Sequence, residues 1–535
     1  MISRSFRWLI LPTITRTVLA LGLLIGSISA QCAGQEEKPS GAVHGQKGIA
    51  ERPWAAVWMS SLARVLAACD VVYESVDRPE LADSLEDRLQ FSEFRGIDRT
   101  RPLGMMWTWD DVQEPPAVIF LPVQQIDDLL KTATFGVVDF HKVKENQYEI
   151  ERPGAPYHVV VRSGYALFGE DVSAMDALRE APERLTRELR DKYDIVFMLD
   201  QRQVPPESKK LWIGEVRRQF EPWLQQQDDE PMESATARRV LGKALLDGIE
   251  RVVQDVQTIT LAGRIDRKTH QLQLDLTVQA EPGSTMAAEL NRLVVQRSEF
   301  SALVHKDASA GLAINWPVML LGKDLSEFSG KALPGGRLDL GIQLIGGDWN
   351  DMTVIAGIRG AEAVALNAAI PHLLTRMEKS AEITSLKRNA GQYRGVDLHQ
   401  ISLAHVPDIL QAIAPSAIEI FVGQGKQTVW LAAGPPDTLE ERLNAAIDVV
   451  QDTPAAERSN AVMQARLSIG KWPTVLPLVN PQDTVEGLGD SKDGFSLTVQ
   501  PSRNGLIIQV VAEQGLLRVI GRHWARQVDQ AAAAE

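Results

Sequence analysis

Two pairs of side chains have the residue types and the spacing to bind a ligand. Trp107 and Trp109 are separated by one residue, so on a strand both indoles would point to the same side of the sheet. Indole faces stack on sugar rings, and an exposed pair would form a carbohydrate-binding platform. A buried pair would belong to a hydrophobic core, which is the commoner setting for large aromatic residues on strands.

Asp348 and Asp351 form the second pair, and Asp348 follows Gly346 and Gly347 in a turn. Two carboxylates can bind calcium or share a proton in acid–base catalysis. A calcium loop needs oxygen ligands at alternating positions and a closing bidentate acid, and this turn lacks the full pattern. Both residues are therefore weak candidates for ligand binding, and the alternative is that they are solvated turn carboxylates.

The standard catalytic and cofactor motifs are absent from the sequence. None of the nine histidines forms HExxH or HxH, which argues against a zinc hydrolase. No serine lies in a GxSxG turn, and no Gly-Lys pair has the rest of a phosphate-binding loop. The two cysteines, Cys32 and Cys69, provide neither a disulfide framework nor a zinc site. We therefore expect no catalytic residue, no metal and no cofactor.

The elements that position these residues follow a repeated pattern of two alternating strands, a turn and an amphipathic helix. The clearest copy begins at Thr258, and its second strand alternates apolar and polar residues from Leu272 to Val278. In another copy, Asn504-Gly505 is a strong hairpin signal because both positions tolerate positive φ. The six copies lie at residues 103–131, 157–181, 258–294, 338–374, 418–450 and 495–520.

This pattern predicts an α+β fold. Strands with one apolar side form an antiparallel sheet, and the helix after each hairpin supplies the cover for that side. Three copies precede Arg297 and three follow it, so we predict two related halves, at residues 53–297 and 298–528. Each half is expected to consist of repeated hairpin-plus-helix units whose antiparallel sheet is covered by helices.

Other segments add detail to this prediction. Helices are expected at 205–227 and 234–253, and Ile195–Leu199 is apolar throughout, which is typical of a central strand. The body begins near Trp54 with helical patterning, which would place Trp54 and Trp58 on one helix face.

The first 30 residues have the pattern of a cleavable signal peptide. Three arginines precede an apolar stretch from Thr17 to Ala30, which ends in small residues and is too short to span a bilayer. Cleavage near Ala30 would change the formal net charge from −14 to −17. Gln31 fits lipoprotein processing at Cys32 badly, so no lipid anchor is expected.

The rest of the chain bears on localisation and partners. Residues 31–52 are predicted to be a flexible leader and residues 529–535 a flexible tail. No stable membrane span is expected after signal cleavage, so we predict a secreted or periplasmic protein. The chain is 44% hydrophobic, which excludes global disorder, and its acidic balance argues against nucleic-acid binding.

Three segments carry a resemblance to a known family: RPLGMMWTWDD, YHVVVRSGYALFGEDVSAMDAL and KYDIVFMLDQRQVPP. In these segments the chain resembles large secreted proteins of unknown function that are abundant in planctomycete-type bacteria. The resemblance covers roughly residues 55–300, and GFSLTV and NGLIIQVVAEQGLLRVIGR are the most similar parts of the second half. It implies an envelope location and this type of fold, and it implies no activity.

Together these observations favour a non-catalytic scaffold or binding protein of the bacterial cell envelope. Its expected partner is an envelope protein or another copy of the same chain, rather than a small molecule. The alternative is an envelope carbohydrate-binding protein or hydrolase with a non-standard carboxylate site near Trp107 and Trp109.

Overall fold

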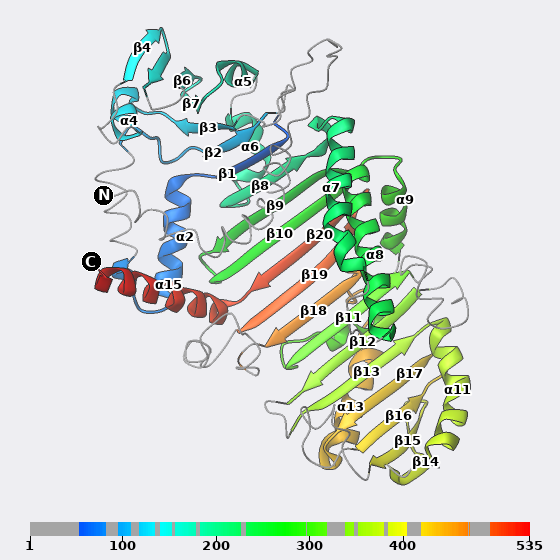
Figure 1. Ribbon diagram of the computed structural model, residues 1–535. Helices are drawn as coiled ribbons and strands as arrows, with labels where there is room; N and C mark the ends of the chain where they lie inside the picture. The colour runs from blue at the N-terminus through cyan, green and yellow to red at the C-terminus, as the bar shows by residue number, and fades with distance from the viewer. Residues whose placement is uncertain are drawn as a thin grey trace. The chain divides into compact units, whose positions relative to one another are not determined.

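The computed structural model has an α+β fold built on antiparallel sheet (Figure 1). It divides into two compact units. Unit 1 comprises the described residues up to Arg267, Val278–Glu281 and the residues from Ile520 onwards, and unit 2 comprises Lys268–Thr277 and Pro282–Val519. The structure describes residues 53–81, 95–108, 117–133, 140–151, 156–177, 182–225, 232–295, 297–317, 337–346, 351–378, 383–403, 419–468, 470 and 493–534.

Unit 1 contains nine strands whose neighbours are all antiparallel, in the sheet order β9-β8-β1-β2-β3-β7-β6-β5-β4. Their bounds are β1 (Ala55–Met59), β2 (Leu103–Trp107), β3 (Ala117–Pro122), β4 (Phe140–Lys144), β5 (Gln147–Ile150), β6 (Tyr157–Arg162), β7 (Tyr165–Gly169), β8 (Ile195–Asp200) and β9 (Val256–Asp266). The helices are α2 (Leu62–Glu74), α4 (Ile126–Ala133), α5 (Val172–Ala177), α6 (Pro182–Arg190), η2 (Gln201–Gln203), α7 (Pro206–Leu224) and α8 (Met232–Asp255).

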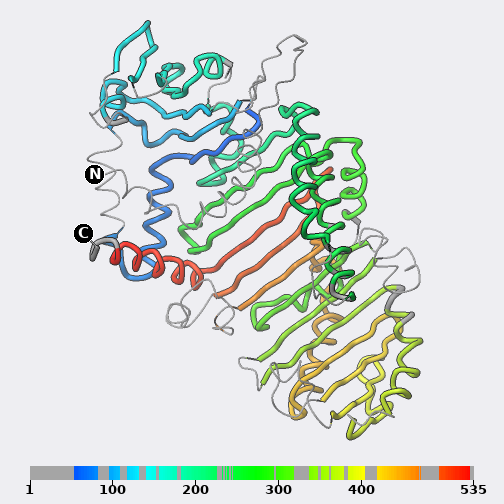
Figure 2. Tube along the Cα trace, in the orientation of Figure 1, coloured from blue at the N-terminus to red at the C-terminus, as the bar shows by residue number. Residues whose placement is uncertain are grey.

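Unit 2 has antiparallel strands in the sheet order β20-β19-β18-β11-β12-β13-β17-β16-β15-β14. Their bounds are β11 (Ala310–Pro317), β12 (Arg337–Ile345), β13 (Thr353–Arg359), β14 (Ile383–Tyr393), β15 (Val396–Leu403), β16 (Glu419–Gln424), β17 (Thr428–Gly434), β18 (Met463–Ser468), β19 (Gly494–Ser502) and β20 (Gly505–Ala512). Figure 2 shows orange β18 beside green β11, although residues 318–462 separate them in the sequence.

Unit 2 also contains most of strand β10 (Gln271–Ala280) and the first residues of helix α15 (Gln514–Ala534). Its other helices are α9 (Thr285–Asn291), η3 (Arg292–Val295), η4 (Glu299–Leu303), α11 (Ala361–Met377) and α13 (Pro436–Asp452). The strand order β9-β8-β1-β2-β3-β7-β6-β5-β4 of unit 1 is matched, position by position, by β19-β18-β11-β12-β13-β17-β16-β15-β14 in unit 2.

Both sides of the unit 1 sheet are covered by helices. On one side, Trp58, Met106 and Phe120 are buried in a cluster that also includes Met175 of α5. On the other side, Leu62 and Leu66 of α2 pack with Leu103, and Trp212 of α7 packs with a cluster that includes Trp54, Phe197 and Leu199. This sheet is therefore the middle layer of three.

Helix α15 contributes its later residues to unit 1, where they pack on α2. The ring centroids of Tyr73 and Trp524 lie 6.4 Å apart, and Ala525 is buried in the same cluster. The Arg78 guanidinium also donates to the Asp529 carboxylate, at 3.1 and 3.2 Å. Residues about 450 positions apart in the sequence thus complete one small core, and part of the segment predicted as a flexible tail is helical.

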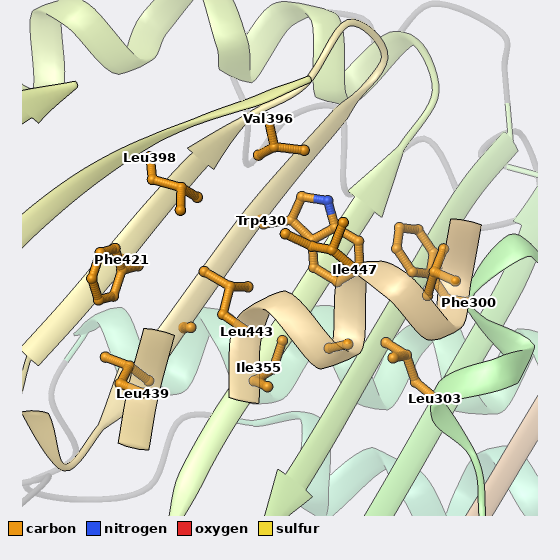
Figure 3. Close-up of a cluster of buried hydrophobic side chains, with 13 residues drawn as sticks. Phe300, Leu303, Ile355, Val396, Leu398, Phe421, Trp430, Leu439, Leu443 and Ile447 are labelled. Carbon is orange, nitrogen blue, oxygen red and sulfur yellow. The ribbon is translucent and has the colours of Figure 1, made fainter. Parts of the chain in front are cut away.

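The larger hydrophobic cluster of unit 2 lies on one side of its sheet (Figure 3). Phe300 of η4 meets Trp430 of β17 edge to face, with 5.5 Å between ring centroids. Gly341 and Gly357 leave space for Phe300, because a Cβ atom at either position would collide with its side chain. Leu439, Leu443 and Ile447 of α13 complete this cluster, which is fully buried from solvent.

Several predicted elements are present. A hairpin followed by a helix occurs at β2-β3-α4, β6-β7-α5, β12-β13-α11, β16-β17-α13 and β19-β20-α15. Asn504 has the positive φ that its turn requires, at 58°. Strand β8 lies between β1 and β9, and α7 and α8 occupy the segments predicted to be extra helices.

The helical prediction at the start of the body is wrong. Ala55–Met59 is strand β1, and Trp54 and Trp58 pack in different hydrophobic clusters rather than on one helix face. Strand pairing with β2 and β8 overrides the local pattern here, because a five-residue apolar segment does not by itself distinguish the two structures. The signal peptide at residues 1–30 and the leader at residues 31–52 lie outside the described residues.

Candidate interaction surface

The structure places Trp107 at the end of β2, where its side chain is half-buried. It packs beside a cluster that includes Trp54, Phe197 and Leu199, on the side of the sheet covered by α7. Packing in the interior of unit 1 therefore accounts for this indole. Trp109 lies outside the described residues, so a paired platform stays a prediction.

Asp351 is exposed and forms an ion pair with Arg442 of α13. The carboxylate accepts from Arg442 Nη2 at 2.8 Å, and the main-chain oxygen of Asp351 accepts from Nη1 at 2.7 Å. The same Nη1 donates to Thr353 Oγ1 at 2.8 Å, so the arginine ties the turn to β13 and α13. Asp348 lies outside the described residues, and Asp351 and Trp107 belong to different units.

No described group of His, Cys, Asp or Glu residues has the arrangement of a metal site. An open hollow of about 560 Å³ beside α13 is lined by Tyr393 and several carboxylates. Two of the acids near it are already paired: Tyr393 Oη donates to Asp448 at 2.7 Å, and Arg394 forms ion pairs with Asp448 and Asp452. The hollow thus resembles a solvated helix face rather than a catalytic cleft.

Two polar residues are buried although the sequence did not predict their burial. His399 of β15 accepts the Asn389 N–H at Nδ1, at 3.1 Å, and its Nε2 lies 3.0 Å from Gln424 Oε1, so both ring nitrogens are used within the fold. Asp339 of β12 is only 8% exposed. It accepts from Ser298 Oγ at 2.6 Å and from the Glu299 N–H at 2.9 Å, and so holds the start of η4 on the sheet.

Burial raises the pKa of the Asp339 carboxyl to about 6, and the hydrogen bond from Ser298 and the charges of Arg458 and Arg337 oppose that rise. Glu299, which follows Ser298, forms ion pairs with Arg359 and Arg458. These contacts bind η4 to β12, β13 and the segment after α13. Their geometry supports a structural role, because η4 carries Phe300 into the core.

The largest unexplained feature is the opposite side of the same sheet. On this side the described residues of six adjacent strands, from β20 to β13, are apolar apart from the indole N–H of Trp316, and all of them except Val499 and Ala512 are half-buried rather than buried. We call it the apolar face; its residues are Leu312, Ile314, Leu340, Ile342, Leu344, Val354, Ala356, Ile358, Met463, Ala465, Leu467, Phe495, Leu497, Val499, Ile508 and Val510.

The helices that pack on β11 and β12 approach from the other side. Gly311 and Gly341 face η4, and Asn315, Asp339 and Gln343 alternate with the apolar residues and are buried there. Figure 1 shows α13 behind the sheet, with β18, β11 and β12 seen from the apolar face.

Two described helices of this unit reach the margins of the apolar face. Val519 of α15 packs with Leu467 and Phe495 at one end. Ile370 and Leu374 of α11 pack with residues of β15, β16 and β17 beyond the other end. Leu431 of β17, the neighbour of Ala356, is 49% exposed. The central strands β18, β11 and β12 therefore offer a broad apolar surface of the kind that marks interaction sites.

The comparisons with known proteins add no assignment to this surface. Among the described residues, no helix is both long enough and apolar enough to cross a membrane. The chain matches no protein-family model, no curated protein and no solved structure.

Proposed function

We propose that this protein is a non-catalytic binding scaffold of the bacterial cell envelope, and that the apolar face of unit 2 is its contact surface. The observation that supports this most strongly is the half-buried state of that face, whose described side chains include none that is charged. Monomeric soluble proteins rarely leave such a large contiguous apolar surface without a partner.

The rest of the molecule favours binding over catalysis. Two of the buried polar groups, Asp339 and His399, are engaged with neighbouring parts of the fold. Asp351 is paired with Arg442, and Trp107 packs beside other apolar side chains. The glycan-binding or hydrolytic alternative therefore has less support than the scaffold.

We also propose that the two units are related halves assembled from hairpin-plus-helix repeats. The equal strand order of the two sheets supports this proposal, because independent folds rarely share the order of nine strands. The proposed location rests on the signal-like pattern before Ala30. N-terminal sequencing of protein from the envelope fraction would test it, and a retained Met1 would contradict it.

Carbene footprinting of the dilute full-length protein tests the contact surface. We expect strong labelling of β11, β12 and β18 at residues such as Ile314 and Leu340, and weak labelling of Phe300 and Leu439, which are fully buried. Exposed Val449, on α13, provides a positive control at 39% exposure. Labelling of the apolar face no stronger than that of the buried pair would exclude it as a contact surface.

A further inference from the structure

We propose that the apolar face of unit 2 pairs with the same face of a second copy of this chain, to form a two-fold symmetric dimer. This inference rests on the proposed function and names the partner of the same surface. A two-fold contact requires a patch that is complementary to itself, and an uncharged apolar sheet face meets that requirement.

The chemistry of the face restricts its partner. Branched aliphatic side chains dominate it, and the polar residues of the same strands, such as Asn315 and Gln343, point to the other side. A partner that recognises charge or hydrogen bonds would find neither here. The partner surface must therefore be apolar and nearly flat, as another sheet face is.

If two copies associate, their net negative charge favours a contact surface without carboxylates, and the apolar face is such a surface. Each copy carries a formal charge of −14, or −17 after cleavage near Ala30, so two copies repel each other across most contacts. A contact centred on the apolar face brings no carboxylate of these strands into the interface. The nearest acid on β12, Asp339, is buried on the far side of the sheet.

The size of the face matches what a stable dimer needs. Six strands at about 4.8 Å spacing span about 29 Å, and three alternate residues along each strand extend about 20 Å. The face therefore offers about 600 Å² per copy. A symmetric pair would bury roughly 1,200 Å², which is the lower limit of stable specific interfaces.

The pattern of side-chain sizes suits the packing of two sheets. Small residues lie beside large ones: Ala465 is the cross-strand neighbour of Leu312, and Ala356 is the neighbour of Ile342. Packed sheets lie about 10 Å apart, with side chains of one sheet filling the gaps of the other. Ala465 and Ala356 provide such gaps for Leu or Ile side chains of the second copy.

Analytical ultracentrifugation of the full-length protein, over about a 100-fold range of concentration, tests the pairing. We expect a wild-type dimer, and a dissociation constant raised by roughly 100-fold or more in Ile314→Lys and in Leu340→Lys, because each places a charge in the interface. The matched control is Val449→Lys, an exposed apolar residue on the α13 side. Its dimer constant should equal that of the wild type.

A second measurement covers the case in which the lysine variants fail to fold. Replacement of Ile314 by p-benzoylphenylalanine keeps the face apolar, and illumination should give a covalent dimer linked through β11, β12 or β18 of the other copy. The same group at Val449 should give none. Cross-links to any other surface of the second copy would overturn the proposed pairing.

The outcomes separate this inference from the proposed function. A wild-type monomer whose apolar face is labelled by carbene overturns the pairing and leaves a different apolar partner, such as a lipid acyl chain. A monomer whose apolar face is not labelled overturns both. A dimer that persists unchanged in folded Leu340→Lys overturns the pairing through this face.

Discussion

Corresponding sheet faces of the two units are covered to different extents. In unit 1, Phe197 and Leu199 of β8 are 9% and 7% exposed and lie beside Trp212 of α7. The matching strand of unit 2 is β18, whose Met463 and Ala465 are half-buried on the apolar face. The two faces have similar composition, so apolar composition alone does not determine what covers a strand face.

The opposite faces differ as well. In unit 1 the other side is an apolar core that includes Trp58, Met106 and Phe120. In unit 2 the matching side combines Phe300, seated over glycines, with buried Asn315 and Asp339. Unit 2 thus buries the more polar side of its central strands and leaves the more apolar one half-buried. Four predictions test this contrast.

The largest effect is expected from Phe300→Ala, because the core of unit 2 depends on this ring over Gly341 and Gly357. We expect the free energy of unfolding of unit 2 to fall by about 3–5 kcal/mol. Urea unfolding followed by hydrogen exchange in β12 and β13 measures it. The control Leu211→Ala removes a residue that is 69% exposed and should change little. A similar small change for Phe300→Ala would show that the glycine-lined site is not a core.

A matched pair of truncations compares the two faces directly. Leu199→Ala in the covered face of unit 1 should cost about 2–4 kcal/mol, and Ile314→Ala in the apolar face about 1 kcal/mol in dilute protein. Denaturant melts read at low concentration, where any dimer is dissociated, give both values. Equal costs would mean that the apolar face is as well packed as its counterpart.

The third prediction concerns pH and Asp339. Its pKa is about 6 in the folded protein, against about 3.9 for an unfolded chain. The folded state therefore takes up a proton more readily, and the stability contributed by this group is present below about pH 4 and is lost as pH rises through about 6. We expect a loss of about 1–3 kcal/mol relative to Asp339→Asn.

Unfolding of both proteins at several values between pH 4 and pH 7 measures this difference. Asn keeps an oxygen that can accept from Ser298 and removes the titration. Parallel stability profiles for the two proteins would rule out a raised pKa at Asp339.

The smallest effect is expected at Asp351, whose side chain is 51% exposed beside Arg442. Exposed ion pairs contribute little, so Asp351→Asn should change stability by about 0.5 kcal/mol or less. Isothermal titration with Ca²⁺ should show no difference between the two proteins. Calcium binding that is lost in the variant would revive the metal alternative for this turn.

The sequence predicted element types well where periodicity and turn residues agree. The alternating strands β12 and β13, the helix α13 and the Asn504 turn all follow from local patterns. Strand β1 was missed, because its five residues are apolar without alternation and their pairing partners are distant in sequence.

The side of a strand that becomes buried was harder to infer. The Leu-Asp-Leu pattern of β12 suggests a solvent-facing Asp339, yet Ser298 and Glu299 approach from a segment 40 residues earlier and bury it. The same alternation produces the apolar face, because the leucines and isoleucines of these strands lie on the side opposite to Asp339. Only tertiary contacts determine which side of an alternating strand is buried. Neither the apolar face nor the buried Asp339 carboxylate could therefore be identified from one sequence.

The contact of α15 with α2 has a consequence for the order in which the chain folds. Tyr73 and Arg78 are synthesised long before Trp524 and Asp529, some 450 residues later, and cannot close their small core until then. Loops of this length close slowly, and unpaired apolar surface invites aggregation meanwhile. A nascent chain therefore leaves the side of α2 that carries Tyr73 without its α15 partner until the last residues of the chain are made.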